Sequence, residues 1–257
     1  MSDSTERLDL VRSGWDAYHS DYMGFNLKEW PLFYEHFASG RVMLDEGVTD
    51  LAGDVTGLRL LDICCAGDAK QAFSWANLGA EVTACDISPI AIEIAQKNAE
   101  RIGLPVTFYV ADAQTLDPIA DESQDLVFAT YLMWFEDISL ALRNWHRVLR
   151  PGGRLLIDTY HPVTDCLDEV DGRIVPGRFY HDTKPEFYEF DGTPLAHRNG
   201  GWDRSVPIVE FHHTLSDIMN AAVEAGFRLA KVEEPYLSGV DGGLAKLPFS
   251  FRSLWQK

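Results

Sequence analysis

Three carboxylates stand where three short apolar segments of the sequence end. They are Asp62, Asp86 and Asp112. In an α/β sheet, a carboxylate after the second strand is the usual partner of a ribose diol, because it accepts from both hydroxyls. A carboxylate after the third strand accepts from an exocyclic amine in the same way. The three residues together predict a nucleoside-binding site.

The turn after the first segment, residues 64–68, reads Cys-Cys-Ala-Gly-Asp. Small residues there let a ligand approach the backbone closely. A dinucleotide site needs a Gly-x-Gly-x-x-Gly turn that brings a helix N-terminus to the pyrophosphate. This turn has one glycine, and Asp68 would repel phosphates. An acidic turn suits the ammonium and sulfonium of S-adenosylmethionine, so this cofactor is favoured over NAD, which stays the alternative.

Alternating apolar segments and helical patterns supply the elements that position these residues. Helical spacing of apolar residues follows the first, second and fourth apolar segments. Ser88 and Pro89 are a helix N-cap and its first residue. Strands are expected at 58–64, 81–85, 106–110, 125–130, 154–158, 228–232 and 248–254. This rhythm predicts a mostly parallel α/β sheet with helices on both faces and ligands beyond the carboxyl ends of its strands.

The chain resembles the class I S-adenosylmethionine-dependent methyltransferases that act on small molecules. The segments that carry the resemblance are 60–67, 79–89, 109–114, 125–130 and 145–155. The resemblance implies a Rossmann-like, seven-stranded, mostly parallel sheet of order 3-2-1-4-5-7-6 with an antiparallel last strand. It also implies S-adenosylmethionine as cofactor and S-adenosylhomocysteine as product.

Cofactor contacts follow from the same resemblance. It implies that Asp86 holds the ribose and Asp112 the adenine amino group, and that the turn 64–68 passes beneath the methionine part. The turn departs from the family's glycine pattern, since Cys64 and Ala66 replace glycines. The implied cofactor-binding residues in the strands and their following turns are Asp62, Cys64, Ala66, Gly67, Asp86, Ile87, Asp112, Ala113 and Thr130.

Aromatic residues are frequent in the first 50 positions, which are expected to be mainly helical. Two interpretations stay open for them. They cover the edge of the sheet, or Tyr18 and Tyr22 close over the cofactor as N-terminal tyrosines do in similar enzymes.

The regular alternation stops after Asp158. Residues 160–209 hold Gly, Pro, Asp and aromatic residues without a long periodic segment. Such a long irregular stretch predicts a cap over the substrate, placed at 160–213. A helix then begins at Thr214, which forms a capping box with Asp217. The expected substrate-binding residues are Tyr131, Trp134, Tyr180, His181 and Trp202.

Histidines gather in the same stretch and supply the candidate general base. His161 directly follows the fifth strand, and His213 immediately precedes the helix that begins at Thr214. Histidine is the usual base at neutral pH, so both are candidate catalytic residues, with a structural role as the alternative.

Composition limits the partners. The 257 residues carry a net charge of −18, which opposes binding to nucleic acids and anionic membranes. The four cysteines include no Cys-x-x-Cys pair, so we expect reduced thiols, no metal site and a cytoplasmic protein. The oligomeric state is not indicated.

We therefore expect one domain over 1–257. Its parts are a helical cover (1–50), a cofactor-binding core (51–159), a cap inserted after the fifth strand (160–213) and a C-terminal helix with strands (214–257). The expected function is methyl transfer to a small-molecule acceptor by in-line displacement. The alternatives are an S-adenosylmethionine-binding protein that transfers no methyl group, and an NAD-dependent oxidoreductase.

Overall fold

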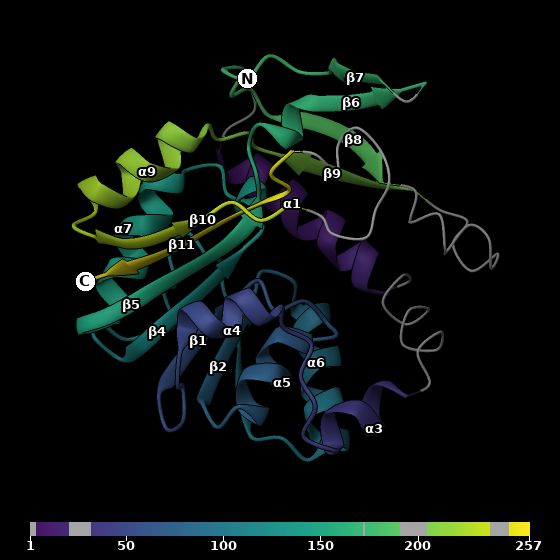
Figure 1. Ribbon diagram of the computed structural model, residues 1–257. Coiled ribbons are helices and arrows are strands. Elements are labelled where there is room, and N and C mark those ends of the chain that lie inside the picture. Colours follow the sequence, from purple (N-terminus) through teal and green to yellow (C-terminus); the bar gives the residue numbers. More distant parts are fainter. Residues whose placement is uncertain (1–3, 21–31, 172, 191–204, 237–246) are drawn as a thin grey trace. The chain divides into compact units, whose positions relative to one another are not determined.

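The computed structural model describes residues 4–20, 32–171, 173–190, 205–236 and 247–257, in which strands and helices alternate (Figure 1). The strands of the main sheet are β1 (Arg59–Ile63), β2 (Glu81–Asp86), β3 (Val106–Val110), β4 (Gln124–Thr130), β5 (Leu149–Tyr160), β10 (Arg228–Glu233) and β11 (Ser250–Gln256). The α-helices are α1 (Ser4–Tyr18), α3 (Phe33–Ala38), α4 (Glu46–Ala52), α5 (Lys70–Asn77), α6 (Pro89–Ile102), α7 (Ile138–Val148) and α9 (Leu215–Glu224).

Seven strands form one sheet in the order β10-β11-β5-β4-β1-β2-β3. The pairs β1–β2, β2–β3 and β4–β5 are parallel. Strand β11 is antiparallel to both of its neighbours, β5 and β10. The predicted seven-stranded, mostly parallel sheet is therefore confirmed, as is its antiparallel last strand.

Contacts between residues divide the chain into two compact units. The first is Met1–Asp45, Asp54–Ala113 and Glu186–Val209, and the second is Glu46–Gly53, Gln114–Pro185 and Glu210–Lys257. The predicted division into cover, core, cap and C-terminal segments stays a prediction.

In the first unit, α5 and α6 pack on the strands β1 to β3. Strand β1 is buried over four successive residues, as expected for a parallel strand covered on both faces. Ser88 caps α6 and Pro89 is its first residue, as predicted. Helix α1 approaches the strand β9 (Val206–Glu210) closely at Gly14, where a Cβ would lie 2.3 Å from the carbonyl oxygen of Pro207.

In the second unit, α7 and α9 pack together on one side of β5 and β10, and α4 lies on the other side (Figure 1). The core contains Trp145 of α7 and Trp255 of β11, both fully buried. The predicted capping box is present at the start of α9, where Thr214 and Asp217 each bond the other's backbone N–H. The capping box thus fixes the backbone at the start of α9.

Strand β5 is longer than expected, because it starts at Leu149 rather than at Arg154. Residues 151–153 form a bulge at which the β4–β5 register shifts. Gly152 has a φ of +76°, and a Cβ on Gly153 would lie 2.8 Å from the carbonyl oxygen of Arg150. The two glycines permit a bulge that other residues would oppose.

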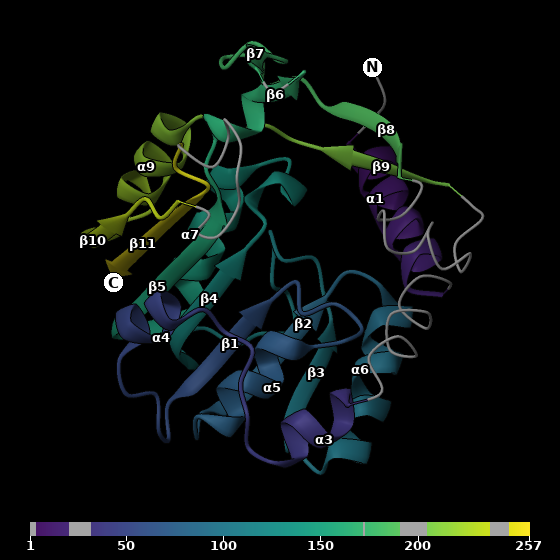
Figure 2. The same ribbon diagram turned by 45° about the vertical axis from the view of Figure 1, so that its right-hand side comes forward.

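The expectation of an irregular segment after Asp158 was wrong in part. Strands β6 (Leu167–Val170) and β7 (Arg173–Pro176) form an antiparallel hairpin, and β8 (Glu186–Phe190) pairs with β9. Figure 2 shows the β8–β9 pair beside α1. The β6–β7 strands have four residues each and expose apolar side chains such as Val170, so they carry little of the alternation that marks a half-buried strand.

None of the four cysteines forms a disulfide. Within the described ranges, the structure contains no helix of the length and apolarity that crossing a membrane requires.

Candidate functional site

The loop after β1 has an unusual backbone. Cys64, Ala66 and Ala69 have φ values of 60°, 57° and 45°, in the left-handed region that side chains oppose. Cys64 and Ala66 are the positions at which the resemblance leads one to expect glycine. The loop therefore keeps a glycine-type conformation with small side chains, and such stored strain is typical of ligand-binding loops.

Asn98 of α6 holds this loop in place. Its side-chain nitrogen donates a 3.0 Å hydrogen bond to the carbonyl oxygen of Gly67, and its side-chain oxygen accepts a 3.0 Å bond from the hydroxyl of Tyr34. Asn98 is buried, so its bond to Gly67 forms away from water. Sequence reasoning missed this residue, because an Asn within a helical pattern has no distinctive signal.

Asp86, at the end of β2, is prepared as a double acceptor. Its Oδ1 accepts from the backbone N–H of Ser88 at 2.9 Å, and its Oδ2 accepts from that of Ala66 at 3.0 Å. The backbone N–H of Ile87 also acts on this carboxylate. A carboxylate has about four lone-pair sites, so it retains acceptor capacity for a ligand hydroxyl. Burial raises the pKa of Asp86 to about 6, against the effect of these N–H groups, and the charge of Asp16 adds to the rise.

Asp16 of α1 reaches this site through Ser88. The Ser88 hydroxyl accepts from the backbone N–H of Ala91 at 3.0 Å and donates to Asp16 Oδ1 at 2.5 Å. Helix α1 is thus tied to the turn that carries Asp86. The sequence marked Ser88 only as a helix cap and did not single out Asp16.

Asp62, on β1, is fully buried, and neither carboxylate oxygen has a hydrogen-bond partner of ordinary geometry among the described residues. Burial raises its pKa well above the usual value, the charges of Asp68 and Asp86 add to this, and the N–H of Ala72 opposes it. A buried carboxylate with so little hydrogen bonding is costly, so a nearby cationic group of a ligand would stabilise its charged form.

Asp112 and Ala113 follow β3. The neighbouring Ala111 donates its backbone N–H to the carbonyl oxygen of Asp86 at 2.9 Å, which joins the two strand ends. The carboxylates of Asp62, Asp86 and Asp112 all act on the Cys64 thiol and, together with burial, raise its pKa well above the usual value. The first unit therefore brings together the predicted residues of its three strand ends, which also include Ala66, Gly67, Ile87 and Ala113.

Tyr18 is the last residue of α1, and its ring lies edge-on to those of Trp15 and His19, with centroids 5.3 and 5.1 Å away. His19 is buried and its pKa is lowered to about 4. Its Nδ1 has no hydrogen-bond partner among the described residues. Tyr22, the second tyrosine predicted near the cofactor, lies outside the described residues.

In the second unit, Thr130 ends β4 and Tyr131 follows it with a φ of 55°. Tyr131 thereby turns the chain into the short 3-10 helix Leu132–Trp134, which contains the predicted Trp134. The ring of Tyr131 lies 6.1 Å from that of Tyr160. The Thr130 hydroxyl is buried without a hydrogen-bond partner among the described residues. These residues follow the carboxyl end of a parallel strand, as predicted.

His161 follows β5 and is buried. Its Nδ1 accepts from the backbone N–H of Val163 at 3.2 Å, so Nε2 carries the proton that it shares with Glu234 Oε1 at 2.9 Å. Both ring nitrogens are therefore used within the protein. This arrangement favours a structural role over the predicted catalytic one.

His213 precedes α9 and has a different environment. Its Nε2 lies 2.7 Å from the carbonyl oxygen of Phe135 and so carries a proton, which leaves Nδ1 as the acceptor nitrogen of the neutral ring. Burial lowers the pKa of His213, and the bond to Phe135 opposes this. A neutral imidazole with an acceptor nitrogen is the form that a general base requires.

The predicted residues of the cap lie partly in the second unit. The hydroxyl of Tyr180 accepts from the backbone N–H of Leu215 at 2.8 Å, at the first turn of α9. The ring of His181 lies 5.2 Å from that of Tyr180. Trp202 lies outside the described residues. No group of three or more His, Cys, Asp or Glu in the described part of the chain is placed to hold a metal ion.

Comparisons with known proteins agree with the fold and the strand ends. The family model of a methyltransferase domain matches residues 61–157. A demethylmenaquinone methyltransferase from Thermus thermophilus is 37% identical over 115 residues, which cover 44% of this chain and 52% of that protein. An S-adenosylmethionine-dependent Diels-Alderase from Neonectria is 33% identical over 143 residues, which cover 53% of this chain and 52% of that protein. The chain thus spans about half the length of these relatives.

A solved S-adenosylmethionine-dependent methyltransferase from Mesorhizobium loti has the same fold. It matches with a TM-score of 0.63 at 22% identity, over 82% of this chain and 96% of that chain. The matched family model covers β1 to β5 and contains Asp62, Asp86 and Asp112. Residues 61–157 therefore resemble a methyltransferase domain, and the chain shares its fold with a solved S-adenosylmethionine-dependent methyltransferase.

Proposed function

We propose that this protein transfers a methyl group from S-adenosylmethionine to a small-molecule acceptor and releases S-adenosylhomocysteine. The observation that carries the proposal is Asp86, a buried carboxylate at the end of β2 that the backbone N–H groups of Ser88 and Ala66 orient. Its remaining acceptor sites would take the two adjacent hydroxyls of a ribose. The match of residues 61–157 to a methyltransferase domain supports the rest of the assignment.

The other strand ends fit the same cofactor. The buried carboxylate of Asp62 would face its cationic groups, and Asp112 would accept from its adenine amino group. Thr130, Ile87, Ala113 and Tyr18 are proposed to complete the contacts. The cofactor supplies an activated methyl group, so the chain's own residues mainly align the acceptor and exclude water, and alignment contributes roughly 7–11 kcal/mol.

A base is needed only for an acceptor that must lose a proton. His213 is the better candidate of the two predicted histidines, because its Nδ1 is the acceptor nitrogen of a neutral ring. Tyr131, Trp134, Tyr180 and His181 are proposed to contact the acceptor. The free cysteine thiols fit a reducing compartment, so we also propose a cytoplasmic location. Because the net charge is −18, we propose no nucleic acid or membrane partner.

Calorimetry with S-adenosylhomocysteine and with NAD tests the cofactor assignment. We expect binding of S-adenosylhomocysteine alone, and its loss in Asp86→Ala. A control substitution at the exposed Glu93 of α6, Glu93→Ala, is expected to leave binding unchanged. Binding of NAD instead would overturn the proposal.

The reaction itself is tested with methyl-deuterated S-adenosylmethionine and a metabolite extract. We expect a product whose mass rises by one CD3 group in place of hydrogen, together with S-adenosylhomocysteine. One relative is named as an S-adenosylmethionine-dependent Diels-Alderase, a name that describes a reaction other than methyl transfer. The assay therefore has to detect the transferred label and not only the binding of the cofactor. Tight cofactor binding without label transfer to any acceptor would favour a cofactor-binding protein that transfers no methyl group.

A further inference from the structure

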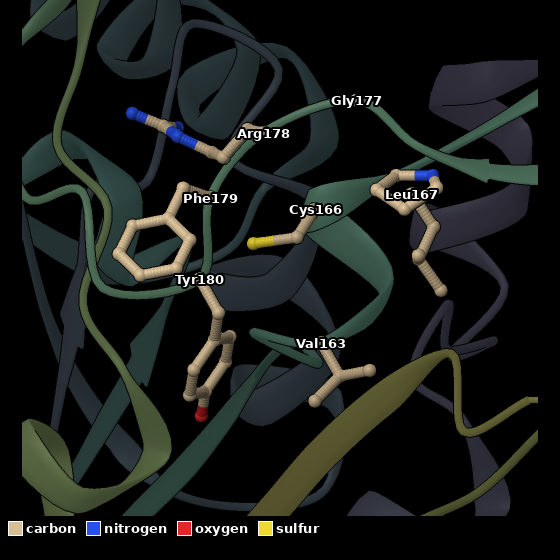
Figure 3. Close-up of a pocket in the computed structure, with 8 residues that line it drawn as sticks. Val163, Cys166, Leu167, Gly177, Arg178, Phe179 and Tyr180 are labelled. Atoms are coloured by element: carbon tan, nitrogen blue, oxygen red, sulfur yellow. The ribbon is translucent and has the colours of Figure 1, made fainter.

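A cavity of about 530 Å³ lies in the second unit (Figure 3). Its walls come from the turn after β5, from β6 and from the segment that follows β7. Its lining includes Val163, Cys166, Leu167, Arg178, Phe179 and Tyr180. The volume lies within the range of roughly 300–1,000 Å³ that small-molecule sites occupy.

Hydrogen bonds hold the walls of this cavity in place. The Tyr180 hydroxyl accepts from the N–H of Leu215, and the Tyr180 carbonyl oxygen accepts from His212 Nε2 at 2.9 Å. On the other wall, the Cys166 carbonyl oxygen accepts from the N–H of Gly177 at 3.0 Å. The walls are therefore fastened to the start of α9, next to His213, and the cavity is formed without a ligand.

Cys166 turns its sulfur into the cavity, toward the rings of Phe179 and Tyr180 (Figure 3). His212 Nε2 lies 3.6 Å from that sulfur and must carry a proton, because it also bonds the Tyr180 carbonyl oxygen. The thiol thus faces an N–H group rather than a proton acceptor. It adds a weakly polar, polarisable atom to a mostly apolar wall.

The lining also determines which ligands are favoured. Arg178 is the one charged residue among the described lining residues, and it is basic. The guanidinium group of Arg178 favours an anionic ligand over a cationic one. Phe179 is 71% exposed and Val163 38% exposed, so apolar surface at the cavity remains in water until a ligand covers it.

We propose that this cavity binds the apolar body of the methyl acceptor, a ring-containing small molecule that is neutral or anionic. The proposal rests on the proposed function. The apolar wall and the basic Arg178 select the class of molecule, and the hydrogen bonds to the start of α9 keep the site open.

The first test uses 1-anilinonaphthalene-8-sulfonate, an aromatic anion whose fluorescence reports binding, with (1-naphthyl)methylammonium as the cationic comparison. We expect saturable binding of the anion and at least tenfold weaker binding of the cation. Val163→Trp fills the cavity and should lower the affinity for the anion about tenfold or more. Val170→Trp, at a 52% exposed valine that does not line the cavity, is the matched control and should change nothing.

Alkylation of Cys166 by N-ethylmaleimide, followed by peptide mass spectrometry, locates the bound probe. The anion should slow the reaction of Cys166. Binding that leaves this rate unchanged, or that Val163→Trp does not weaken, overturns the proposal. Thermal unfolding checks the folding of each variant. Because Phe179 is largely exposed, Phe179→Ala gives a second variant that should weaken binding and keep the fold.

Acceptors from the deuterium-label experiment separate this inference from the proposed function. An acceptor found there should displace the anion from the cavity. A labelled acceptor that does not compete, or that is cationic, overturns the cavity proposal while methyl transfer stands. If S-adenosylhomocysteine does not bind and the anion does, the proposed function fails and the occupant is not a methyl acceptor.

Discussion

The Ser88 hydroxyl donates a 2.5 Å hydrogen bond to Asp16 Oδ1, and the Ser88 backbone N–H donates to Asp86 Oδ1. One serine thereby joins helix α1 to the carboxylate proposed to hold the ribose. The charge of Asp16 raises the pKa of Asp86, although burial is the larger cause. The protonation of Asp86 therefore depends in part on Asp16 of the N-terminal helix.

Cofactor binding should depend on pH through Asp86. Its pKa of about 6 means that the carboxylate is ionised above pH 6 and takes up a proton below it. A protonated carboxyl group cannot accept from both ribose hydroxyls. We therefore expect the affinity for S-adenosylhomocysteine to be constant near pH 8 and to fall up to about tenfold per pH unit below pH 6. Calorimetry over this range measures the midpoint.

Asp16→Asn is the matched variant, since its side-chain oxygen still accepts from the Ser88 hydroxyl but carries no charge. Removing that charge lowers the pKa of Asp86, so the midpoint should move to lower pH. An unchanged midpoint would show that α1 does not act on the ribose site electrostatically.

Replacing Ala66 by glycine should stabilise the protein or leave its stability unchanged. Ala66 has a φ of 57°, where a side chain costs roughly 1–2 kcal/mol, and glycine removes that cost but makes the unfolded chain more flexible. The expected change in the free energy of unfolding is a gain of up to about 1 kcal/mol. Ala76→Gly, within α5, is the control and should lose about 1 kcal/mol. Equal losses in both variants, measured by urea unfolding, would contradict strain at Ala66.

Asn98→Ala should destabilise the fold by about 2 kcal/mol, because it leaves the Gly67 carbonyl and the Tyr34 hydroxyl without this partner. It should also weaken S-adenosylhomocysteine binding, since the loop after β1 loses its anchor. Tyr34→Phe removes only the bond on the far side of Asn98, so it should cost about 1 kcal/mol and keep the affinity. Equal affinity losses in the two variants would argue against a role of Asn98 in holding the loop.

Substitutions of the two candidate histidines, His213 and His161, should have different effects on kcat. His213→Ala is expected to lower kcat by about 10²–10⁴-fold if the acceptor loses a proton in the reaction. His161→Ala should mainly reduce stability, because it removes bonds to Glu234 and to the N–H of Val163. Since burial lowers the pKa of His213, the wild-type rate should start to fall only below pH 6.5 as the ring takes up a proton. An unchanged kcat in His213→Ala would show that His213 is not a general base and that alignment of the acceptor is sufficient for the reaction.

The sequence allowed the sheet to be predicted because each parallel strand is a short apolar segment followed by a helix with clear start and stop signals. Ser88, Pro89 and the Thr214–Asp217 pair mark helix starts by local hydrogen bonding, which does not depend on distant residues. Asp62, Asp86 and Asp112 could be grouped because the carboxyl ends of parallel strands meet at one edge.

What could not be predicted depends on contacts between distant residues. Asp16 meets Ser88, and Tyr34 meets Asn98, only after folding, and neither pair has a characteristic spacing. The β6–β7 hairpin was missed because its short strands lack a buried face. His161 was chosen for its place after a strand, and the partners of its ring nitrogens became visible only in three dimensions.

Burial and the carboxylates around the loop after β1 also keep Cys64 from reacting with the proposed cofactor. A sulfonium methyl group is an electrophile, and the form of cysteine that attacks electrophiles is the thiolate. Burial and the charges of Asp86, Asp62 and Asp112 raise the pKa of Cys64 well above its usual value, so the residue remains a thiol. Cys64 can therefore replace a glycine beneath the proposed methyl donor without becoming the acceptor of its methyl group.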